Sequence, residues 1–303
     1  MRVIVPPHIS GIWCVVRKDN LLKSGSLGVG VTLAPPLIIE PLGSKKDYIV
    51  MGNKSVNLST VTYALEEILK LPKDRVITVR VKAKEYLKIG YGYGLSAAIT
   101  LGAAAINMVL NKDLMVSKGF KVSLNEAGKV AHISEIVNQT GYGDLMAEMH
   151  GGGLVVRVKE GGPGYGVVDK IPVSSSIKVI TAHLKRPKHT KVMLNEMGRR
   201  GIELGLKYFN EFMKDPSIET FSRLAHDFSL ETGLMTLEED LKIKESLRDL
   251  LSSSGVLGYF IKKSLLVVVA EEQVVNDVTY ALLKNFGHAY VFNLYFGSTY
   301  MVV

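Results

Sequence analysis

The chain has 303 residues, 47% of them hydrophobic and 22% charged, and its formal net charge at pH 7 is +8. This composition excludes a disordered chain, and the length allows two cores of about 100–150 residues or one large domain. The single cysteine, Cys14, excludes both a disulfide framework and a thiolate metal site within one chain, which fits a reducing compartment.

No apolar run approaches the roughly 18 residues that would span a bilayer. The segment MRVIVPPHISG carries prolines where a signal peptide needs a longer apolar run, so we expect a cytoplasmic protein that does not bind membranes. The basic residues are scattered without interleaved aromatic residues, which argues against nucleic acid as the partner. A polyanionic small molecule such as ATP would suit the positive charge equally well.

Short β-strands punctuated by glycine and proline are expected over the first part of the chain. The predicted strands are 2–7, 11–16, 28–34, 37–42, 48–52 and 76–83. Apolar residues at helical spacing predict a helix over 60–71, and the small-residue run LSAAITLGAAAINMVL predicts another over 95–110. A capping box formed by Ser123 and Glu126 begins a third helix, which stops at TGYGD, and GGLVVRVKE follows as a strand.

The composition changes around Gly161–Gly166, beyond which glycines become sparse. The second part is predicted to contain strands at 177–183, 264–272, 289–296 and 299–303, and helices at about 192–213, 216–232, 236–252 and 275–287. Many neighbouring strands look hairpin-linked, which favours an α+β fold over a doubly wound parallel sheet. We expect two domains, 1–168 and 169–303.

A glycine-rich segment, Gly90-Tyr-Gly92-Tyr-Gly94, lies between a predicted strand and the helix that begins LSAA. Glycines let the backbone approach phosphate oxygens, and the first amides of a helix are unpaired and carry the positive end of its dipole. Ser96 would lie in the first helical turn, where its hydroxyl can reach a phosphate or a bound Mg²⁺. The segment therefore indicates an anion site.

Other interpretations of these glycines compete. A Walker-type loop is excluded because no Lys-Ser/Thr follows them. Gly92-x-Gly94-x-x-Ala97 fits the spacing of a dinucleotide fingerprint, with Asp113 about 20 residues further on. However, Asp113 directly follows the predicted helix in a polar turn and does not end a second parallel strand. A tight turn whose small residues serve only packing also stays open.

The segment GYGYGLSAAITLGAA resembles the second motif of GHMP kinases, with Leu95 in place of the first serine. Further segments narrow the resemblance to the archaeal pantoate kinases, and they are VPPHISGIW, KSGSLGVGV and AHISEIVNQTGYGDLMAEMHGGGLVVRVKEGGPG. The resemblance implies a two-domain fold, with a ribosomal-S5-domain-2-like N-terminal domain and a ferredoxin-like C-terminal domain. It also implies Mg·ATP-dependent phosphorylation of the terminal hydroxyl of pantoate in coenzyme A biosynthesis, and a homodimer.

The resemblance assigns roles to individual residues. Phosphate binding falls to Gly90, Gly92, Gly94, Leu95, Ser96, Ala97 and Ala98. Ser96 and Glu135 would bind Mg²⁺, and Asp144, after Gly-Tyr-Gly, would deprotonate or orient the substrate hydroxyl. The candidate substrate contacts are His8, Ser24, Ser26, His132 and Arg157. The third GHMP motif is reduced to Gly255-Val-Leu-Gly258, which leaves the C-terminal contribution to the nucleotide site open.

Most of these residues also have an ordinary structural interpretation. Glu135 can be a solvated helix residue, Asp144 a helix cap, and Arg157 a residue on a solvated sheet face. His132 alone would suit a structural role, and the serines suit turn hydrogen bonding. Among functions, another GHMP kinase for homoserine or mevalonate is the nearest alternative. A basic RNA-binding protein and a non-catalytic nucleotide sensor are the alternatives from other classes.

Overall fold

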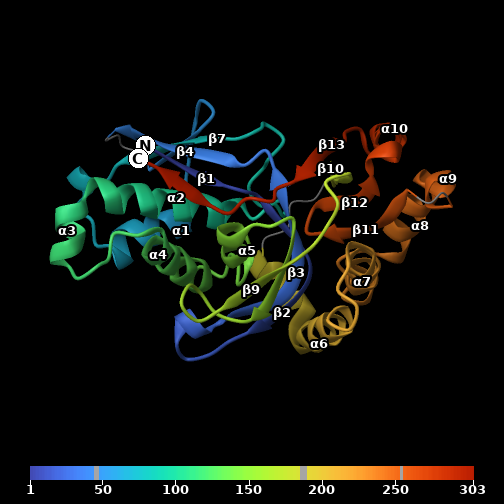
Figure 1. Cartoon of the computed structure of the whole chain (residues 1–303), viewed down its shortest axis with the longest axis horizontal. Helices are drawn as coiled ribbons and strands as arrows, with labels where there is room; N and C mark the ends of the chain where they lie inside the picture. Colours follow the sequence, from blue (N-terminus) through green and yellow to red (C-terminus); the bar gives the residue numbers. More distant parts are fainter. Residues whose placement is uncertain (44–47, 185–189, 253–254) are drawn as a thin grey trace.

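The computed structural model describes residues 1–43, 48–184, 190–252 and 255–303, and the backbone alone for 190–197. Two β-sheets form the framework, with helices packed around them (Figure 1). Almost all strand pairs are antiparallel, so the α+β prediction is confirmed. Within these ranges, the helices are all too short or too polar to cross a membrane.

The first sheet has six strands and contains both ends of the chain. Its order is β14 (Tyr300–Val302), β1 (Arg2–Val5), β4 (Leu37–Gly43), β7 (Thr78–Lys82), β5 (Ile49–Met51) and β6 (Lys54–Val56). Because β14 pairs with β1, the two termini lie side by side (Figure 1). Helix α2 (Leu95–Leu110) packs closely on this sheet, since a Cβ added to Gly102 would lie 2.3 Å from Cδ1 of Ile39.

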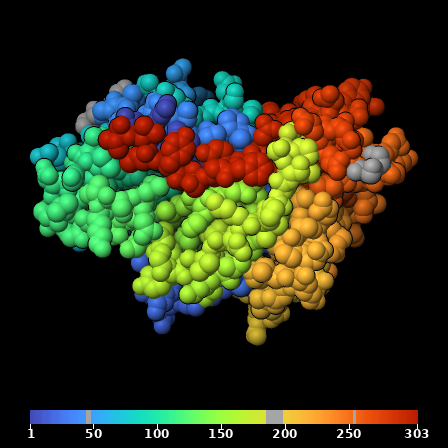
Figure 2. Space-filling model, viewed as in Figure 1, coloured from blue at the N-terminus to red at the C-terminus, as the bar shows by residue number. Residues whose placement is uncertain are grey.

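The second sheet has eight strands and joins the two parts of the chain. Its path is β11 (Val256–Lys262), β12 (Leu265–Glu271), β10 (Ile177–His183), β13 (Tyr290–Leu294), β3 (Gly25–Ala34), β8 (Leu154–Lys159) and β9 (Val167–Ile171), while β2 (His8–Val16) pairs with β3. Strand β13 pairs with β3 through Asn293–Ala34 and Leu294–Leu33. The final segment then runs along the surface of the N-terminal half (Figure 2). The division after residue 168 stays a prediction.

The remaining helices lie on both sides of the molecule, except for α5, which lies near its centre (Figure 1). They are α1 (Ser59–Thr62), α3 (Lys112–Ser117), α4 (Leu124–Val137), α5 (Asp144–His150), α6 (Thr190–Phe212), α7 (Ile218–Glu231), α8 (Leu237–Ser246), α9 (Arg248–Leu251) and α10 (Val275–Phe286). Helices α6 and α7 pack against β2, and α7 also packs against β11.

The structure corrects several sequence predictions. The segment 60–71 is a short α-helix followed by a π-helical segment, Tyr63–Ile68, and 236–252 is two helices, α8 and α9. Strands β6, β9 and β11 were not predicted, because each is short or contains glycine, lysine or charged residues that weaken the alternating pattern. Asp113 lies in helix α3 and not in a turn, and it does not end a strand.

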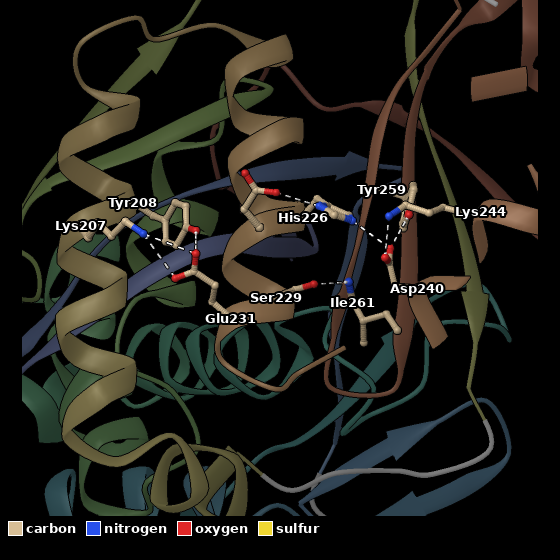
Figure 3. Close-up of polar contacts among 10 residues, drawn as sticks. Lys207, Tyr208, His226, Ser229, Glu231, Asp240, Lys244, Tyr259 and Ile261 are labelled. Atoms are coloured by element: carbon tan, nitrogen blue, oxygen red, sulfur yellow. Dashed lines mark hydrogen bonds and ion pairs between the residues drawn. The ribbon is translucent and has the colours of Figure 1, made fainter. Parts of the chain in front are cut away.

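A polar network joins α7, α8 and β11 in the C-terminal part (Figure 3). Asp240 is its centre, since its carboxylate accepts hydrogen bonds from Tyr259 (2.5 Å), His226 Nε2 (3.0 Å) and Lys244 (2.7 Å). In the same strand as Tyr259, the backbone amide of Ile261 donates a hydrogen bond to Ser229 Oγ of α7 at 3.4 Å. These bonds connect the second half of β11 with α7 and α8.

Candidate active site

Two pockets meet between the sheets. The larger, of about 590 Å³, is lined by the glycine-rich segment and by Ser96 and Glu135, and we call it the glycine-loop pocket. The smaller is lined by Ser10, Ser26, Arg157 and Lys262 among others, and we call it the Arg157 pocket. Asp144 and Lys263 line both pockets. These two side chains therefore lie where the pockets adjoin.

The glycine loop has the backbone that its sequence suggests. Gly90, Gly92 and Gly94 have φ values of +89°, +127° and +74°, a region that residues with a Cβ rarely adopt. Gly94 caps the N-terminus of α2, and a Cβ there would lie 2.2 Å from Oε1 of Glu148. All three positions therefore favour glycine for conformation, and Gly94 also requires it for space.

The residues that follow the loop divide between pocket and core. Leu95 and Ser96 line the glycine-loop pocket, whereas Ala97 and Ala98 are fully buried and their side chains do not line it. The amides of both alanines donate to the carbonyl of Gly94, at 3.0 and 3.3 Å. Their small side chains thus serve close packing of α2.

Ser96 and Glu135 are in direct contact, since the Ser96 hydroxyl donates to Oε1 of Glu135. Glu135 is 4% exposed, so it is not a solvated helix residue. Hydroxyl and carboxylate oxygens suit Mg²⁺, which is usually held by one or two carboxylates together with substrate phosphates. Consistent with so few protein ligands, the described residues contain no group of three or more His, Cys, Asp or Glu side chains placed to hold a metal.

Burial raises the pKa of Glu135 to about 7, although hydrogen bonds from Ser96 and Thr140 oppose the rise. A metal and a proton compete for this carboxylate, so we expect Mg²⁺ affinity in the presence of ATP to fall about tenfold per pH unit below 7. Titration with Mg²⁺ between about pH 5.5 and 8 measures this dependence. Glu135→Gln should abolish the pH dependence of Mg²⁺ affinity and lower turnover. Glu126→Gln on the same helix should leave that pH dependence and turnover unchanged. An affinity independent of pH in the unmodified protein would contradict the prediction.

The same shift predicts the pH dependence of stability without metal. The folded state holds the Glu135 proton more tightly than the unfolded chain, whose glutamate pKa is 4.5. Stability from this group is therefore present below pH 4.5 and is lost as the pH rises through about 7, at about 1.4 kcal/mol per pKa unit. The stability of Glu135→Gln should not fall in this way as the pH rises, and thermal unfolding at several pH values measures the difference.

Asp144 is the first residue of α5 and lies where the pockets join. His8 Nδ1 is 2.8 Å from Oδ1, the Ser10 hydroxyl donates to the same oxygen at 3.3 Å, and the Lys262 ammonium is 3.6 Å away. Its carboxylate makes no helix-capping hydrogen bond, since Gly143 occupies the N-cap position. The Asp144 carboxylate thus contacts residues around the pockets and does not cap the helix.

The charges around Asp144 keep it ionised. Burial alone would raise the pKa of its carboxyl, but the positive charge of Lys262 and the hydrogen bond from His8 hold that pKa well below its usual value. Burial lowers the pKa of His8 to about 4, so its imidazole is neutral at pH 7 and donates from Nδ1 to the carboxylate. Lys262, with its ammonium 5.0 Å from the Trp13 ring centroid, has a pKa lowered to about 8, mainly by burial.

Arg157 is 2% exposed, so it does not lie on a solvated sheet face. Its Nε donates to Ser26 Oγ at 3.2 Å and its terminal Nη2 to Ser10 Oγ at 3.4 Å. The other terminal nitrogen, Nη1, is buried without a partner among the described residues. Burial lowers the pKa of the guanidinium to about 10, so it stays charged at pH 7. The pocket therefore presents a buried cation with an open donor, which suits a carboxylate.

The structure does not bring every predicted substrate contact into the pocket. His132 is buried, and its Nε2 contacts the carbonyl of Ser24 at 2.9 Å. The Ser24 hydroxyl forms hydrogen bonds with the backbone amide and carbonyl of Lys18. This is the turn hydrogen bonding that the structural interpretation of Ser24 predicts. Ser26 lines the Arg157 pocket, and His8 reaches it only through Asp144.

Sequence reasoning missed Ser10, Lys262 and Lys263. Ser10 belongs to the quoted VPPHISGIW segment, and the paired lysines stand out as charges between two apolar runs, but neither pattern specifies a contact. Gly255 and Gly258 serve packing, since added Cβ atoms would lie 2.5 Å from Val274 and 3.0 Å from Ser222. The C-terminal part therefore reaches the pockets through the lysines and not through these glycines.

Comparison with known proteins agrees with this geometry. No protein-family model matches the chain. The pantoate kinase of Methanocaldococcus jannaschii is 29% identical over 287 residues, which cover 93% of this chain and 97% of that protein. The pantoate kinase of Thermococcus kodakarensis is also 29% identical, over 90% of this chain and 89% of that protein.

Solved structures show the same relationship. A phosphotransferase related to the CoA biosynthesis pathway is 26% identical and has a TM-score of 0.76, covering 99% of this chain and 97% of its own. MDDEF in complex with MVAPP, AMPPCP and magnesium is 12% identical with a TM-score of 0.67, over 99% of this chain and 98% of its own, and shares the fold. Over most of its length the chain is similar to the archaeal pantoate kinases, and it shares its fold with a phosphotransferase related to the CoA biosynthesis pathway.

Proposed function

We propose that this chain transfers the γ-phosphoryl group of ATP to the terminal hydroxyl of pantoate. The observation that carries the proposal is the position of Asp144, an ionised carboxylate between the glycine-loop pocket and a pocket containing a buried arginine. The similarity to proteins named pantoate kinase supports the choice of acceptor. A phosphotransferase of the CoA biosynthesis pathway with the same fold supports the reaction class.

The chemistry of pantoate matches the Arg157 pocket. Its carboxylate would accept from the open Nη1 of Arg157, and its terminal hydroxyl would donate to Asp144. The hydroxyl oxygen attacks the γ-phosphorus, the bond to the β–γ bridging oxygen breaks, and ADP leaves. Because the pKa of Asp144 is so low, this carboxylate mainly orients the hydroxyl and accepts its proton late, as the new P–O bond forms.

The glycine loop and the Ser96–Glu135 pair would serve the nucleotide. The loop amides would hold phosphate oxygens, and Ser96 and Glu135 would hold Mg²⁺, which neutralises phosphate charge when bound. AMPPCP and magnesium are bound together in a relative of the same fold, which supports this part of the proposal. His132 and Ser24 would position the adjoining loop. A homodimer, and the lack of a nucleic-acid partner, stay predictions.

An ADP-release assay tests the function. With Mg·ATP we expect turnover with pantoate and little with homoserine, mevalonate or galactose. Turnover with another acceptor would retain the kinase and reject pantoate. ATP binding without turnover on any acceptor would favour a nucleotide sensor. RNA binding that weakens steeply between about 50 and 200 mM salt would favour the nucleic-acid alternative.

A further inference from the structure

The β11–β12 hairpin brings two consecutive lysines, Lys262 and Lys263, to the place where the pockets meet. Lys262 ends β11 opposite Leu265, so Lys263 is the first residue of a two-residue turn. The hairpin also packs on the glycine loop, since a Cβ added to Gly92 would lie 3.1 Å from the carbonyl oxygen of Lys262. The C-terminal part thus places the two positively charged side chains of this hairpin next to the glycine loop.

The two lysines differ in what their side chains contact. Lys262 lines only the Arg157 pocket and is engaged by Asp144 and the Trp13 ring. Lys263 lines both pockets, and its charge interacts with the carboxylates of Asp144 and Glu135. In the described ranges, no hydrogen bond or ion pair holds its ammonium. It is therefore a cation available to a ligand at the junction.

The backbone of Lys263 is also unusual. Its φ is +55°, which is uncommon for a residue with a Cβ. Two-residue hairpin turns with this conformation at their first position favour glycine there. A lysine at such a position adds backbone strain, and strain of this kind concentrates at functional sites. Glycine would suit the conformation of this turn better, so the turn itself does not account for a lysine at this position.

We infer that Lys263 binds the phosphoryl group during its transfer from ATP to the acceptor. This inference rests on the proposed kinase function and names the residue that contacts the reacting group from the C-terminal part. In the loose transition state, negative charge spreads over the three equatorial oxygens of the phosphoryl group. An ammonium that lines both pockets together with Asp144 would neutralise that charge and offset repulsion from the Asp144 and Glu135 carboxylates.

Steady-state kinetics of Lys263→Ala test the inference. We expect kcat to fall about 10²–10³-fold, as when a preorganised electrostatic contact is removed. The dissociation constant for ATP should change by less than about threefold, because an interaction made mainly in the transition state acts on kcat. Lys263→Arg should recover part of the loss because it retains the charge. Lys284→Ala, which removes an exposed lysine of α10, is the matched control and should retain full activity.

A second variant separates a chemical role from a structural one. Lys263→Gly removes the charge and suits the positive φ, so its melting temperature should equal or exceed that of the unmodified protein while its kcat falls as in Lys263→Ala. Full kcat in a folded Lys263→Gly protein would overturn the inference, as would a loss seen only in KM for ATP. Lack of turnover with pantoate in the unmodified protein would instead reject the proposed function.

Discussion

Replacing Asp144 with asparagine should lower kcat for pantoate by about 10³-fold, within the range found for general acid–base residues. Asparagine keeps the size of the side chain but removes the negative charge. The substrate hydroxyl then meets a neutral amide, whose oxygen accepts a weaker hydrogen bond than a carboxylate does, and its proton has no carboxylate to receive it. Single-turnover measurements at saturating Mg·ATP and pantoate would report this step directly.

The affinity of Asp144→Asn for ATP should be unchanged or tighter, because the variant removes a negative charge next to the phosphates and leaves the glycine loop intact. Asp169→Asn is the matched control, since Asp169 is exposed on β9 and its carboxylate accepts a hydrogen bond from the adjacent amide of Lys170. Activity in Asp144→Asn within about threefold of the unmodified protein would remove Asp144 from the reaction.

The low pKa of Asp144 adds a further expectation for the pH profile. Lys262 and His8 keep this carboxylate ionised well below its ordinary range, so its protonation should not limit turnover at mildly acidic pH. The acidic limb should instead follow Glu135, whose pKa is about 7 before metal binds. Saturating Mg²⁺ should therefore shift that limb to lower pH. A limb that Mg²⁺ leaves in place would assign it to another group.

Replacing Arg157 with methionine should lower kcat/KM for pantoate by about 10²–10³-fold, as expected when one member of a charged, desolvated pair is removed. The loss should lie mainly in KM, because a carboxylate remote from the reacting hydroxyl is bound in ground and transition states alike. Lys at this position should recover little, since an ammonium cannot reproduce the planar set of donors that contacts Ser26 and Ser10.

A matched acceptor and a matched arginine sharpen this test. The triol in which the carboxylate of pantoate is reduced to an alcohol should be a poor acceptor for the unmodified protein. Arg157→Met should lose most of the discrimination between the two acceptors. Arg80→Met, which replaces an exposed arginine between the buried Val79 and Val81 of β7, should behave like the unmodified protein. Undiminished discrimination in folded Arg157→Met would place the carboxylate elsewhere.

Much of the site could be predicted from short segments of sequence. The glycine loop, Ser96 and the start of α2 lie within a few residues of one another, and their conformations follow from glycine φ preferences and helix-end hydrogen bonding. The hydrogen bond that caps the helix after Ser123 was also predicted, and the Ser123 hydroxyl accepts it from the amide of Glu126. Asp144 and Glu135 were identified through family motifs. The structure adds their contacts with His8, Lys262 and Ser96.

Other parts of the site had no local signal. His8 and Asp144 are 136 residues apart, and the distance between them depends on how β2 and α5 pack. His132 belongs to a segment that resembles a family motif, but its side chain contacts a backbone carbonyl and does not line the pocket. The lysines of the hairpin could not be assigned, because β11 itself was not predicted and a turn lysine is ordinarily solvated.

The sequence Val-Arg-Val occurs twice, at Val79–Val81 in β7 and Val156–Val158 in β8, and it separates the two kinds of information. Alternation and β-branched residues are sufficient to predict a strand in both places, because strand formation depends on near neighbours. One arginine is exposed and the other is buried beside Asp144. Burial and charge pairing depend on which distant elements cover each strand face, so only the tertiary structure distinguishes the solvated arginine from the one in the site.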